Sequence, residues 1–282
     1  MQIFTDPIEL QRQCLAWKQD GLKIGLVPTM GYFHKGHLSL MECARKQCDR
    51  LVVTLFVNPT QFGENEDLDK YPHDFDGDKA KAESAGVDAL FVPQGADMYA
   101  PNHATWVEVP KLAKHLCGAS RPIHFRGVCT VVTKLFMLAQ PSVAVFGQKD
   151  WQQLAILRRM ARDLNIPVEI VGHEIVREPD GLALSSRNTY LTEEERAAAP
   201  AIRKGLLKLA DTVRGGERDA DKAVAFLTEE YAKTLPMGRP DYITLVDPDD
   251  IQPVKTIEGP VLAAVAIQVG KARLIDNILI EV

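Results

Sequence analysis

The sequence has little cysteine, and its cysteines follow no metal-binding or disulfide pattern. Five cysteines stand at positions 14, 43, 48, 117 and 129, and none of them forms a C-x-x-C pair. An odd number without such spacing argues against a disulfide framework and against a cysteine zinc site.

Long apolar runs and an excess of basic residues are also missing. Residues 1–20 contain Asp6, Glu9, Arg12 and Lys18, so they lack the apolar centre of a secretory signal, and no later run reaches membrane-spanning length. The formal net charge is −5, whereas proteins that bind nucleic acids normally carry a basic surface. The sequence predicts a cytoplasmic protein that binds neither nucleic acid nor membrane.

What the chain does contain is an ordinary globular composition. It has 282 residues, of which 46% are hydrophobic and 25% are charged. That length is sufficient for two modest hydrophobic cores.

The first part of the chain alternates between predicted strands and predicted helices. The apolar or β-branched runs expected as strands are Lys23–Pro28, Leu51–Val57, Val87–Pro93, Ser142–Phe146 and Val168–Val176. The stretches with helical spacing are Leu38–Cys48, Phe75–Ala85, Val128–Ala139 and Trp151–Asn165. This alternation predicts an α/β fold with a doubly wound parallel (Rossmann-like) sheet over residues 1–176.

The pattern changes after residue 176. Thr192–Glu195 has the form of a capping box and is expected to open a long helix that continues to about Val213 and ends at Gly215-Gly216. The elements expected after it are the helix Asp219–Leu235 and the strands Tyr242–Val246, Val261–Val269 and Arg273–Ile280. Helices followed by strands predict a second, smaller α+β domain over residues 177–282 that shares an interface with the first.

The segment Val27–His37 carries the first chemical signal. It follows a predicted strand, and ligands of open α/β sheets bind at the carboxyl ends of strands. Gly31 and Gly36 allow the backbone to approach a ligand, and the helix that begins near Gly36 is expected to offer unpaired N–H groups to an anion. The imidazoles of His34 and His37 can donate hydrogen bonds to phosphate oxygens. This segment predicts an anion-binding turn.

Two other interpretations of the histidine pair are open. An isolated H-x-x-H can be two surface or satisfied histidines, or half of a metal site. No third His, Cys or carboxylate stands at a useful spacing nearby, which weakens the zinc interpretation. The order strand, glycine-bearing turn and helix favours a nucleotide site.

The segment P-T-M-G-x-x-H-x-G-H resembles the H-x-G-H motif of the nucleotidyltransferase superfamily that includes class I aminoacyl-tRNA synthetases. A second superfamily element is a Ser/Arg-rich loop after the last strand of the sheet, and Asp180–Asn188 occupies that position. Ser185, Ser186 and Arg187 are the groups there that can hold the β- and γ-phosphates. A polar interdomain turn with Arg187 in a surface ion pair is the alternative.

Two further segments follow predicted strands. In Phe146–Gln153, Lys149 can reach the α-phosphate and Asp150 can cap the next helix or hold a ribose hydroxyl, although a solvated lysine beside a capping aspartate is also possible. In Phe56–Phe62, Asn58 and Gln61 offer amides that suit a substrate with hydroxyl and carboxylate groups. A simple Asn-Pro turn is the alternative for Asn58.

Five motifs in one order make the resemblance more specific. They are P-T-M-G-x-x-H-x-G-H, F-V-N-P-x-Q-F, S-R-P-x-H-F-R-G-V, F-G-x-K-D-x-Q-Q and D-G-L-A-L-S-S-R-N. Together they resemble the pantothenate synthetase (pantoate–β-alanine ligase) family. The match runs from Val27 to Asn188 and includes the tail Ala272–Asn277. Phe33, Gln148 and Trp151 depart from the residues that are usual in the family, and none of these departures removes a donor named above.

The resemblance implies a two-step ligation. The carboxylate of pantoate attacks the α-phosphorus of ATP and pyrophosphate leaves, after which the amine of β-alanine attacks the pantoyl-adenylate to give pantothenate and AMP. The resemblance also implies that ATP arrives with Mg²⁺ as a substrate, that no cofactor is tightly bound, that the smaller domain closes over the ATP site, and that the chain forms a homodimer through its larger domain.

The resemblance assigns roles residue by residue. His37, His34 and Lys149 are the implied catalytic residues. The implied ATP contacts are Met30, Gly31, Tyr32, Phe33, His34, Lys35, Gly36, His37, Gly147, Gln148, Lys149, Asp150, Val176, Leu184, Ser185, Ser186 and Arg187. Gln61 is implied to bind pantoate and to lie near β-alanine, and Gln153 to bind pantoate, with Asn58 also in the substrate site. Arg121 and Arg126 lie in the third motif and receive no role, and no side chain is assigned to a metal.

Three other functions are weighed against this one. A nucleotidyltransferase that adenylates a different small acceptor keeps the fold, but a phosphate acceptor would call for basic residues where Gln61 and Gln153 stand. A nucleotide-sensing module without catalysis does not need donors on both sides of the α-phosphate. An enzyme that charges tRNA would need an anticodon-reading module and a basic surface, which the sequence lacks.

Overall fold

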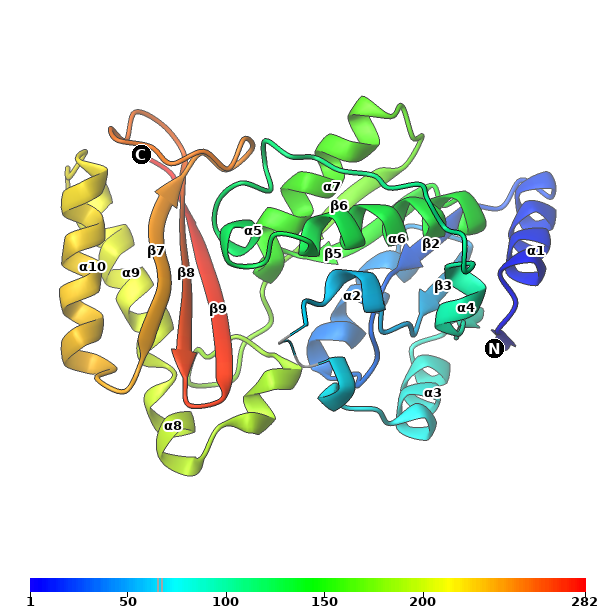
Figure 1. The fold of residues 1–282 in the computed structure, drawn as a ribbon, viewed down its shortest axis with the longest axis horizontal. Helices are drawn as coiled ribbons and strands as arrows, with labels where there is room; N and C mark the ends of the chain where they lie inside the picture. The colour runs from blue at the N-terminus through cyan, green and yellow to red at the C-terminus, as the bar shows by residue number, and fades with distance from the viewer. Residues whose placement is uncertain (65, 67) are drawn as a thin grey trace. The chain divides into compact units, whose positions relative to one another are not determined.

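The computed structural model describes residues 1–64, 66 and 68–282, which form two compact units (Figure 1). The six-stranded unit comprises Met1–Pro110, Arg121–Gln148 and Ile156–Glu174. The three-stranded unit comprises Lys111–Ser120, Lys149–Ala155 and Ile175–Val282. Two short segments that precede residue 176 therefore pack with the later part of the chain. The domain boundary at residue 176 itself stays a prediction.

The six-stranded unit contains one parallel sheet. Its strands are β1 (Gln2–Phe4), β2 (Ile24–Val27), β3 (Arg50–Thr54), β4 (Ala89–Phe91), β5 (Val143–Gly147) and β6 (Glu169–His173). They lie in the order β1-β4-β3-β2-β5-β6, and every neighbouring pair is parallel. All four residues of β2 are buried, as expected for a strand covered on both faces. The predicted doubly wound parallel sheet is confirmed.

Helices cover both faces of this sheet. They are α1 (Pro7–Gln19), α2 (Lys35–Arg45), α3 (Phe75–Ser84), α4 (Gly95–Met98), α6 (His124–Ala139) and α7 (Trp151–Asp163), with 3-10 turns η1 (Pro59–Gln61), η2 (Leu68–Lys70) and η3 (Gln148–Asp150). Right-handed crossovers put α2 and α3 on one face and α1, α6 and α7 on the other. Figure 1 agrees, since α2 and α6 lie on opposite sides of the strands.

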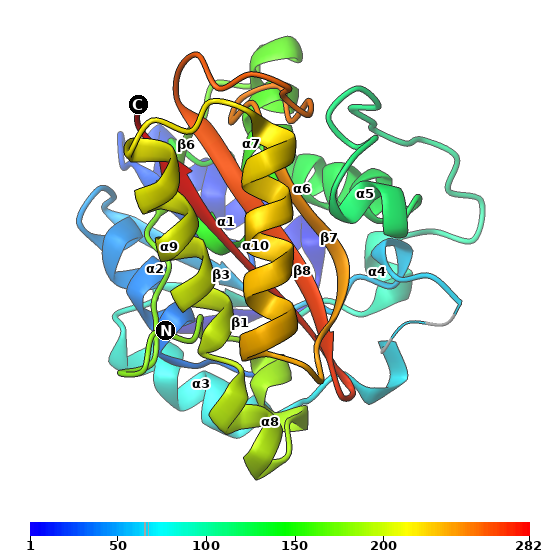
Figure 2. The same ribbon diagram turned by 90° about the vertical axis from the view of Figure 1, so that its left-hand side faces the viewer.

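The three-stranded unit is an antiparallel sheet covered by helices. Its elements are α5 (Cys117–Ser120), η4 (Ser186–Tyr190), α8 (Glu193–Ala198), α9 (Ala201–Arg214), α10 (Ala220–Thr234), β7 (Arg239–Val246), β8 (Val261–Val269) and β9 (Ala272–Ile280). The strands pair in the order β7-β8-β9. Figure 2 shows α9 and α10 side by side on one face of this sheet. The predicted α+β character is confirmed.

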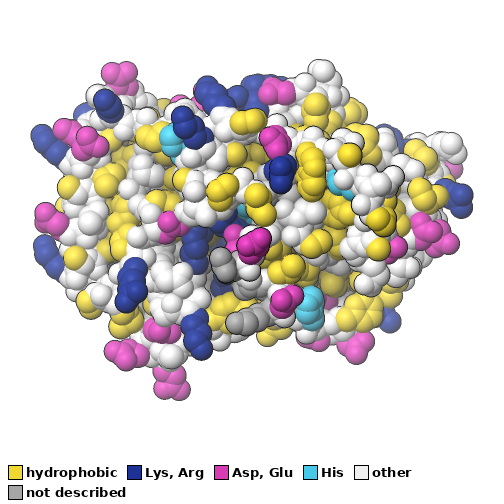
Figure 3. Space-filling view, viewed as in Figure 1, with side chains coloured by type: hydrophobic (Ala, Val, Ile, Leu, Met, Phe, Trp, Pro, Cys, Tyr) yellow, Lys and Arg dark blue, Asp and Glu magenta, His cyan; other side chains and the backbone are white. Residues whose placement is uncertain are grey.

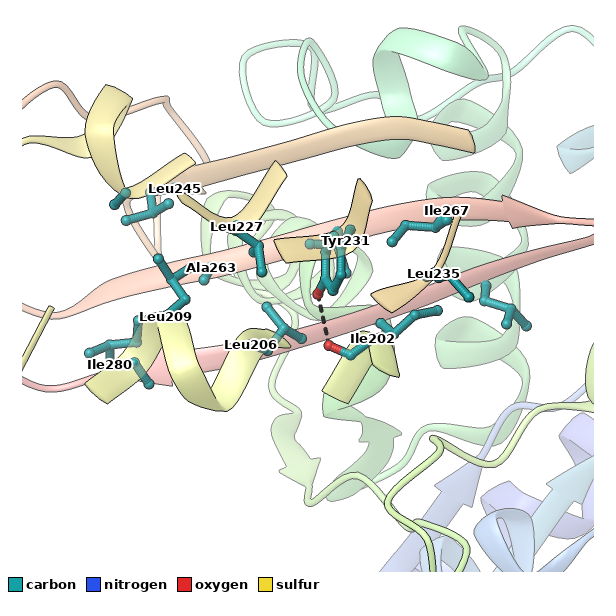
Figure 4. Close-up of a cluster of buried hydrophobic side chains, with 14 of the residues drawn as sticks. Ile202, Leu206, Leu209, Leu227, Tyr231, Leu235, Leu245, Ala263, Ile267 and Ile280 are labelled. Carbon is teal, nitrogen blue, oxygen red and sulfur yellow. Dashed lines mark hydrogen bonds between the residues drawn. The ribbon is translucent and has the colours of Figure 1, made fainter. Parts of the chain in front are cut away.

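The core of the three-stranded unit lies between those helices and the sheet (Figure 4). Leu206 and Leu227 have no exposed surface, and Ile267 is 1% exposed. Tyr231 is buried in the same cluster, and its hydroxyl donates a 2.7 Å hydrogen bond to the carbonyl of Ile202. This bond satisfies a polar group that burial would otherwise make costly.

The long helix predicted after Thr192 is wrong in one respect, because it is two helices. The capping box is present: the Thr192 side chain accepts from the backbone N–H of Glu195, and the Glu195 carboxylate accepts from the N–H of Thr192. However, α8 ends at Ala198 and α9 starts after Pro200. Proline has no N–H and its ring clashes with the preceding turn, so a continuous helix is broken there.

The first twenty residues, for which no element was predicted, contain β1 and α1. The signals were present. Asp6 caps α1 through its side chain and Pro7 occupies the first turn. The buried residues Leu10, Cys14 and Trp17 recur at helical spacing.

Charge on the visible surface is mixed. Figure 3 shows Lys and Arg side chains interspersed with Asp and Glu side chains, without a continuous basic stripe on this face. Within residues 1–64, 66 and 68–282, no helix is long and apolar enough to cross a membrane.

Candidate active site

The carboxyl ends of β2 and β5 lie where the order of the strands reverses. β2 pairs with β3 on one side and with β5 on the other, and the crevice at such a switch point is where open α/β sheets bind ligands. The chain leaves β2 through residues 28–34 and leaves β5 through Gly147 and Gln148. A Cβ atom on Gly147 would meet no atom within 4 Å, so the backbone is accessible to a ligand there.

The turn after β2 is held in an unusual backbone conformation. Gly31 has a φ of 93° and Tyr32 a φ of 56°, and a left-handed conformation costs a non-glycine residue energy. The Asp78 side chain on α3 compensates, because its two carboxylate oxygens accept the N–H groups of Tyr32 at 2.7 Å and Phe33 at 2.6 Å. Asp78 is 1% exposed. Sequence reasoning missed it, because no local pattern connects position 78 with the turn.

His34 and His37 are locked to the start of α2. The Nδ1 atom of His34 accepts from the N–H of Gly36 at 3.1 Å, and the Nδ1 atom of His37 accepts from the N–H of His34 at 3.4 Å. The two ring centroids are 4.2 Å apart. An Nδ1 atom that accepts a hydrogen bond carries no proton, so each neutral imidazole has its proton on Nε2. Both rings therefore have a donor N–H on the edge that faces away from the backbone.

One detail of the sequence-based expectation was wrong. The N–H groups at the start of α2 were expected to be unpaired, but Gly36 donates to the His34 ring and His37 donates to the His34 carbonyl at 2.9 Å. The histidine cap already uses these donors. An anion at this turn is therefore expected to meet imidazole N–H groups rather than these backbone groups.

Gln61 lies close to the same turn. Its Nε2 atom contacts the sulfur of Met30 at 3.3 Å, and its Oε1 atom accepts from Asn58 Nδ2 at 3.1 Å. Asn58 is 1% exposed and Gln61 is 8% exposed. The structure thus brings together Met30, Asn58 and Gln61, three residues that the sequence placed in two separate motifs.

Arg121, which received no role from the sequence, supports Gln61. Its guanidinium binds both carboxylate oxygens of Glu66 and donates to the Gln61 carbonyl at 3.4 Å. Burial alone would raise the pKa of Glu66, but the hydrogen bonds and charge of Arg121 hold that pKa below its usual value. Arg126 instead lies over the Trp106 ring at 4.7 Å.

The three-stranded unit includes Lys149–Ala155, the residues that directly follow Gln148. Lys149 lies 3.3 Å from Asp150, and its carbonyl accepts a 3.0 Å hydrogen bond from the Asn277 side chain on β9. Of the two adjacent glutamines, Gln152 is buried and donates to two backbone carbonyls, whereas Gln153 is half-buried. The tail motif, which carried no role in the sequence, thus fixes the main chain at Lys149.

Hydrogen bonds join two pairs of the predicted residues in the loop after β6. The N–H of Leu184 donates to the carbonyl of Val176 at 2.9 Å, and Ser185 caps η4 by accepting from the N–H of Arg187 at 3.3 Å. Ser186 is buried and Arg187 is half-buried. The Ser185 cap therefore holds the backbone of residues 185–187, which we call the serine-arginine segment, in one conformation.

An ion pair anchors the base of that loop. Arg177 and Asp276 form two hydrogen bonds, at 2.7 and 2.9 Å, and Asp276 is 4% exposed. Arg177 also donates to the carbonyl of Gly181, whose φ of 95° makes the tight turn. The ion pair was not predicted, because Arg177 and Asp276 stand 99 positions apart.

Within residues 1–64, 66 and 68–282, no three His, Cys, Asp or Glu side chains form a metal-binding group.

A family model and one curated relative match this chain over nearly its whole length. The model of the family described as pantoate-beta-alanine ligase matches residues 2–279. The pantothenate synthetase of Maridesulfovibrio salexigens is 65% identical over 282 residues, which cover 100% of both chains.

Solved structures agree with these matches. The pantothenate synthetase of Thermus thermophilus superimposes with a TM-score of 0.91 at 43% identity and covers 99% of each chain. A pantoate-beta-alanine ligase from Francisella tularensis, solved in complex with beta-gamma ATP and beta-alanine, superimposes with a TM-score of 0.78 at 31% identity. That match covers 99% of this chain and 97% of the other.

Proposed function

Because the chain belongs to the pantoate-beta-alanine ligase family, it condenses pantoate with β-alanine at the expense of ATP, and we propose which of its residues carry the reaction. The enzyme is an AMP-forming ligase that joins an acid to an amine through a pantoyl-adenylate. The observation on which the residue assignment depends is the histidine pair, whose Nδ1 atoms are bonded to the backbone at the switch point of the sheet.

His34 and His37 bind the phosphates in this proposal. Their Nε2–H groups donate to phosphoryl oxygens on which negative charge grows as the pantoate carboxylate attacks the α-phosphorus. The backbone bonds of the two Nδ1 atoms support this role, because they orient both rings before ATP binds. We assign catalytic roles to His37, His34 and Lys149.

Lys149 and the serine-arginine segment act on the same triphosphate from the three-stranded unit. Lys149 is a compact cation on a long stem and neutralises the α-phosphate. Ser185, Ser186 and Arg187 hold the β- and γ-phosphates until pyrophosphate leaves. We propose, from the family resemblance, that this part of the chain closes over ATP.

The remaining proposed ATP contacts lie in the turn after β2, at the end of β5 and in the loop after β6. We propose contacts from Met30, Gly31, Tyr32, Phe33, Lys35, Gly36, Gly147, Gln148, Asp150, Val176 and Leu184. The open space beside Gly147 supports these contacts, because a ligand can approach the backbone there.

Neutral amides bind the second substrate in our proposal. Gln61 binds pantoate and lies near β-alanine, Gln153 binds pantoate, and Asn58 belongs to the same site through its hydrogen bond to Gln61. Amide groups suit a small hydroxy acid, whereas a phosphate acceptor would call for cations. Adenylation of a different small acceptor is therefore not favoured.

We also propose the metal ion, the cellular location and the oligomeric state. ATP is used together with Mg²⁺, which commonly bridges phosphates with few protein ligands, and no cofactor is tightly bound. Use of ATP as a substrate suits a cytoplasmic location. The family resemblance favours a homodimer through the six-stranded unit, which light scattering over a range of protein concentrations can test.

One experiment tests the proposed reaction. Protein, Mg-ATP and D-pantoate are incubated with labelled pyrophosphate, and label in ATP is followed before β-alanine is added. Pantoate-dependent exchange is expected, and AMP is expected to form once the amine is present. No exchange with pantoate and no AMP after the amine would sink the proposal, whereas exchange with another acid would favour the alternative acceptor.

A further inference from the structure

The side-chain amide of Asn58 has only one orientation that its backbone neighbours allow. Its Oδ1 atom accepts from the N–H of Thr60 at 3.4 Å, and its Nδ2 atom donates to the carbonyl of Gly127 at 3.2 Å. A backbone N–H can only donate and a carbonyl can only accept. Reversing the amide would set donor against donor and acceptor against acceptor, so the orientation of Asn58 is fixed.

The fixed amide of Asn58 in turn fixes Gln61. Asn58 Nδ2 also donates to Gln61 Oε1 at 3.1 Å, so Gln61 must use its oxygen as the acceptor. Its Nε2 atom then presents N–H groups, and the partner there is the sulfur of Met30 at 3.3 Å. A thioether is a weak acceptor. A carboxylate or hydroxyl oxygen can replace the sulfur with a net gain for that donor.

Tyr99 forms the other end of this series of hydrogen bonds, opposite Gln61. Its hydroxyl donates to Asn58 Oδ1 at 3.0 Å, and the Thr60 hydroxyl donates to the same oxygen at 3.0 Å. The Tyr99 ring is itself held against the His103 ring, with centroids 5.0 Å apart. Burial raises the pKa of Tyr99, which keeps its hydroxyl protonated and able to donate.

The backbone of Gln61 is fixed as well. Its carbonyl lies 3.0 Å from Nδ1 of His124 on α6, and a Cβ atom on Gly127 of the same helix would come within 2.6 Å of the Gln61 nitrogen. Main chain and side chain of Gln61 are therefore both constrained, and hydrogen bonds decide which end of its amide is presented.

We propose that Tyr99 is a positioning residue which, through Asn58, holds Gln61 with its N–H groups presented to the substrate. This arrangement selects a substrate that offers hydrogen-bond acceptors, namely carboxylate or hydroxyl oxygens, at that point. The inference depends on the proposed function in one respect, since it takes pantoate as the ligand of Gln61.

The direct test is Tyr99→Phe, which removes only the hydroxyl. We expect the KM for pantoate to rise about five- to tenfold, the change that loss of one hydrogen bond produces, while the KM for ATP stays within about twofold. Tyr231→Phe is the matched control, because it also removes a single tyrosine hydroxyl, which donates to a backbone carbonyl in the core of the three-stranded unit. That variant is expected to melt earlier and to leave both KM values unchanged.

Two outcomes would overturn the inference. One is an unchanged KM for pantoate in Tyr99→Phe, and the other is an equal rise in the KM values for pantoate and ATP. The ratio of the two KM values does not depend on the fraction of folded enzyme, so it decides the question even where the variant melts early. Loss of pantoate-dependent exchange in the wild type would instead refute the proposed function.

A double-mutant cycle tests the route through Gln61. If Tyr99 acts through Gln61, Tyr99→Phe combined with Gln61→Ala has the pantoate KM of Gln61→Ala alone. Independent, multiplying effects would overturn the proposed route. Asn58→Asp replaces the donor facing Gln61 with a second acceptor, and we expect its pantoate KM to rise more than that of Tyr99→Phe.

Discussion

Asp78 bonds to the main chain of Tyr32, 46 positions earlier, through a 2.7 Å hydrogen bond to its buried carboxylate. The second carboxylate oxygen accepts from Phe33 at 2.6 Å. Both donors belong to the turn that leads into the histidine pair, and Tyr32 has a left-handed φ of 56°. A helix on one face of the sheet thus determines the shape of the proposed ATP-binding turn.

Asp78→Asn is expected to weaken both the turn and ATP binding. An amide keeps one acceptor, now uncharged, and turns a donor toward the other backbone N–H, so one hydrogen bond is lost and the second is weakened, at a cost of about 1–3 kcal/mol in the free energy of unfolding. Urea unfolding and the KM for ATP measure the two effects. Asp74→Asn is the matched control on the same helix, since Asp74 is the exposed N-cap of α3 and asparagine caps equally well. Equal behaviour of the two variants would contradict the role of Asp78.

Two substitutions at His34 separate its capping of α2 from its proposed hydrogen bond to phosphate. His34→Asn keeps a side-chain acceptor for the N–H of Gly36 but loses the Nε2–H donor, so we expect near wild-type stability and a loss of adenylation of about 10²-fold. His34→Ala loses both and is expected to unfold about 1 kcal/mol more easily. His37→Ala is expected to fold and to lose adenylation. Wild-type exchange rates in His34→Asn and His37→Ala would refute the assigned roles.

The sequence predicted the fold well where the chain repeats simple patterns. β8 was predicted with its observed bounds, Val261–Val269, and α3 was predicted to within one residue at its end. The break at Pro200 was missed because the capping box and the apolar spacing on both sides of it were read as one helix. Apolar spacing and capping correctly predicted that this region is helical. The rule that proline breaks a helix should have divided it at Pro200.

The candidate site was predictable only in part. Motifs supplied residues that follow strands, such as His37 and Lys149, because the carboxyl ends of parallel strands share one edge. The residues that hold them in place were not predictable. Asp78 and Tyr99 contact the site from distant positions, and a buried hydrogen bond leaves no local pattern in the sequence. The assignments themselves stay predictions until the variants are measured.

Gly127→Ala is expected to disturb pantoate binding. A Cβ atom there would lie 2.5 Å from the carbonyl of Thr60, so α6 and η1 must separate. Gly205→Ala is a matched control, because that helical glycine lies 2.4 Å from the Tyr231 ring by the same construction. Both variants are expected to lose about 1–3 kcal/mol of stability, and only Gly127→Ala is expected to raise the KM for pantoate. A similar KM in the two variants would contradict the proposed position of Gln61.

The ion pair of Glu66 predicts a dependence of stability on pH. The pKa of Glu66 is lowered in the folded protein, so its contribution is complete above the unfolded pKa and is lost as the pH falls through the folded pKa. Glu66→Gln is therefore expected to melt earlier than the wild type at pH 7, and the two curves are expected to begin to converge as the pH falls below about 4.3, the ordinary pKa of glutamate. Glu42→Gln is a surface control, because Glu42 and Lys46 form an exposed i,i+4 pair whose effect salt removes. A difference for Glu66→Gln that is constant from pH 7 to pH 3 would contradict the ion-pair explanation.

Lys149→Met is expected to slow adenylation strongly without unfolding the protein. The methionine keeps most of the aliphatic stem, and the Lys149 carbonyl still accepts from the Asn277 side chain, because that bond involves only the main chain. The lost charge faces the α-phosphate in our assignment, so the exchange rate is expected to fall about 10²–10³-fold while stability changes by less than about 1 kcal/mol. Lys111→Met is the matched control, since Lys111 lies in the same unit and also pairs with an aspartate, Asp250, at 2.8 Å. Exchange that is equally fast in both variants would show that the charge of Lys149 does not act on the phosphate.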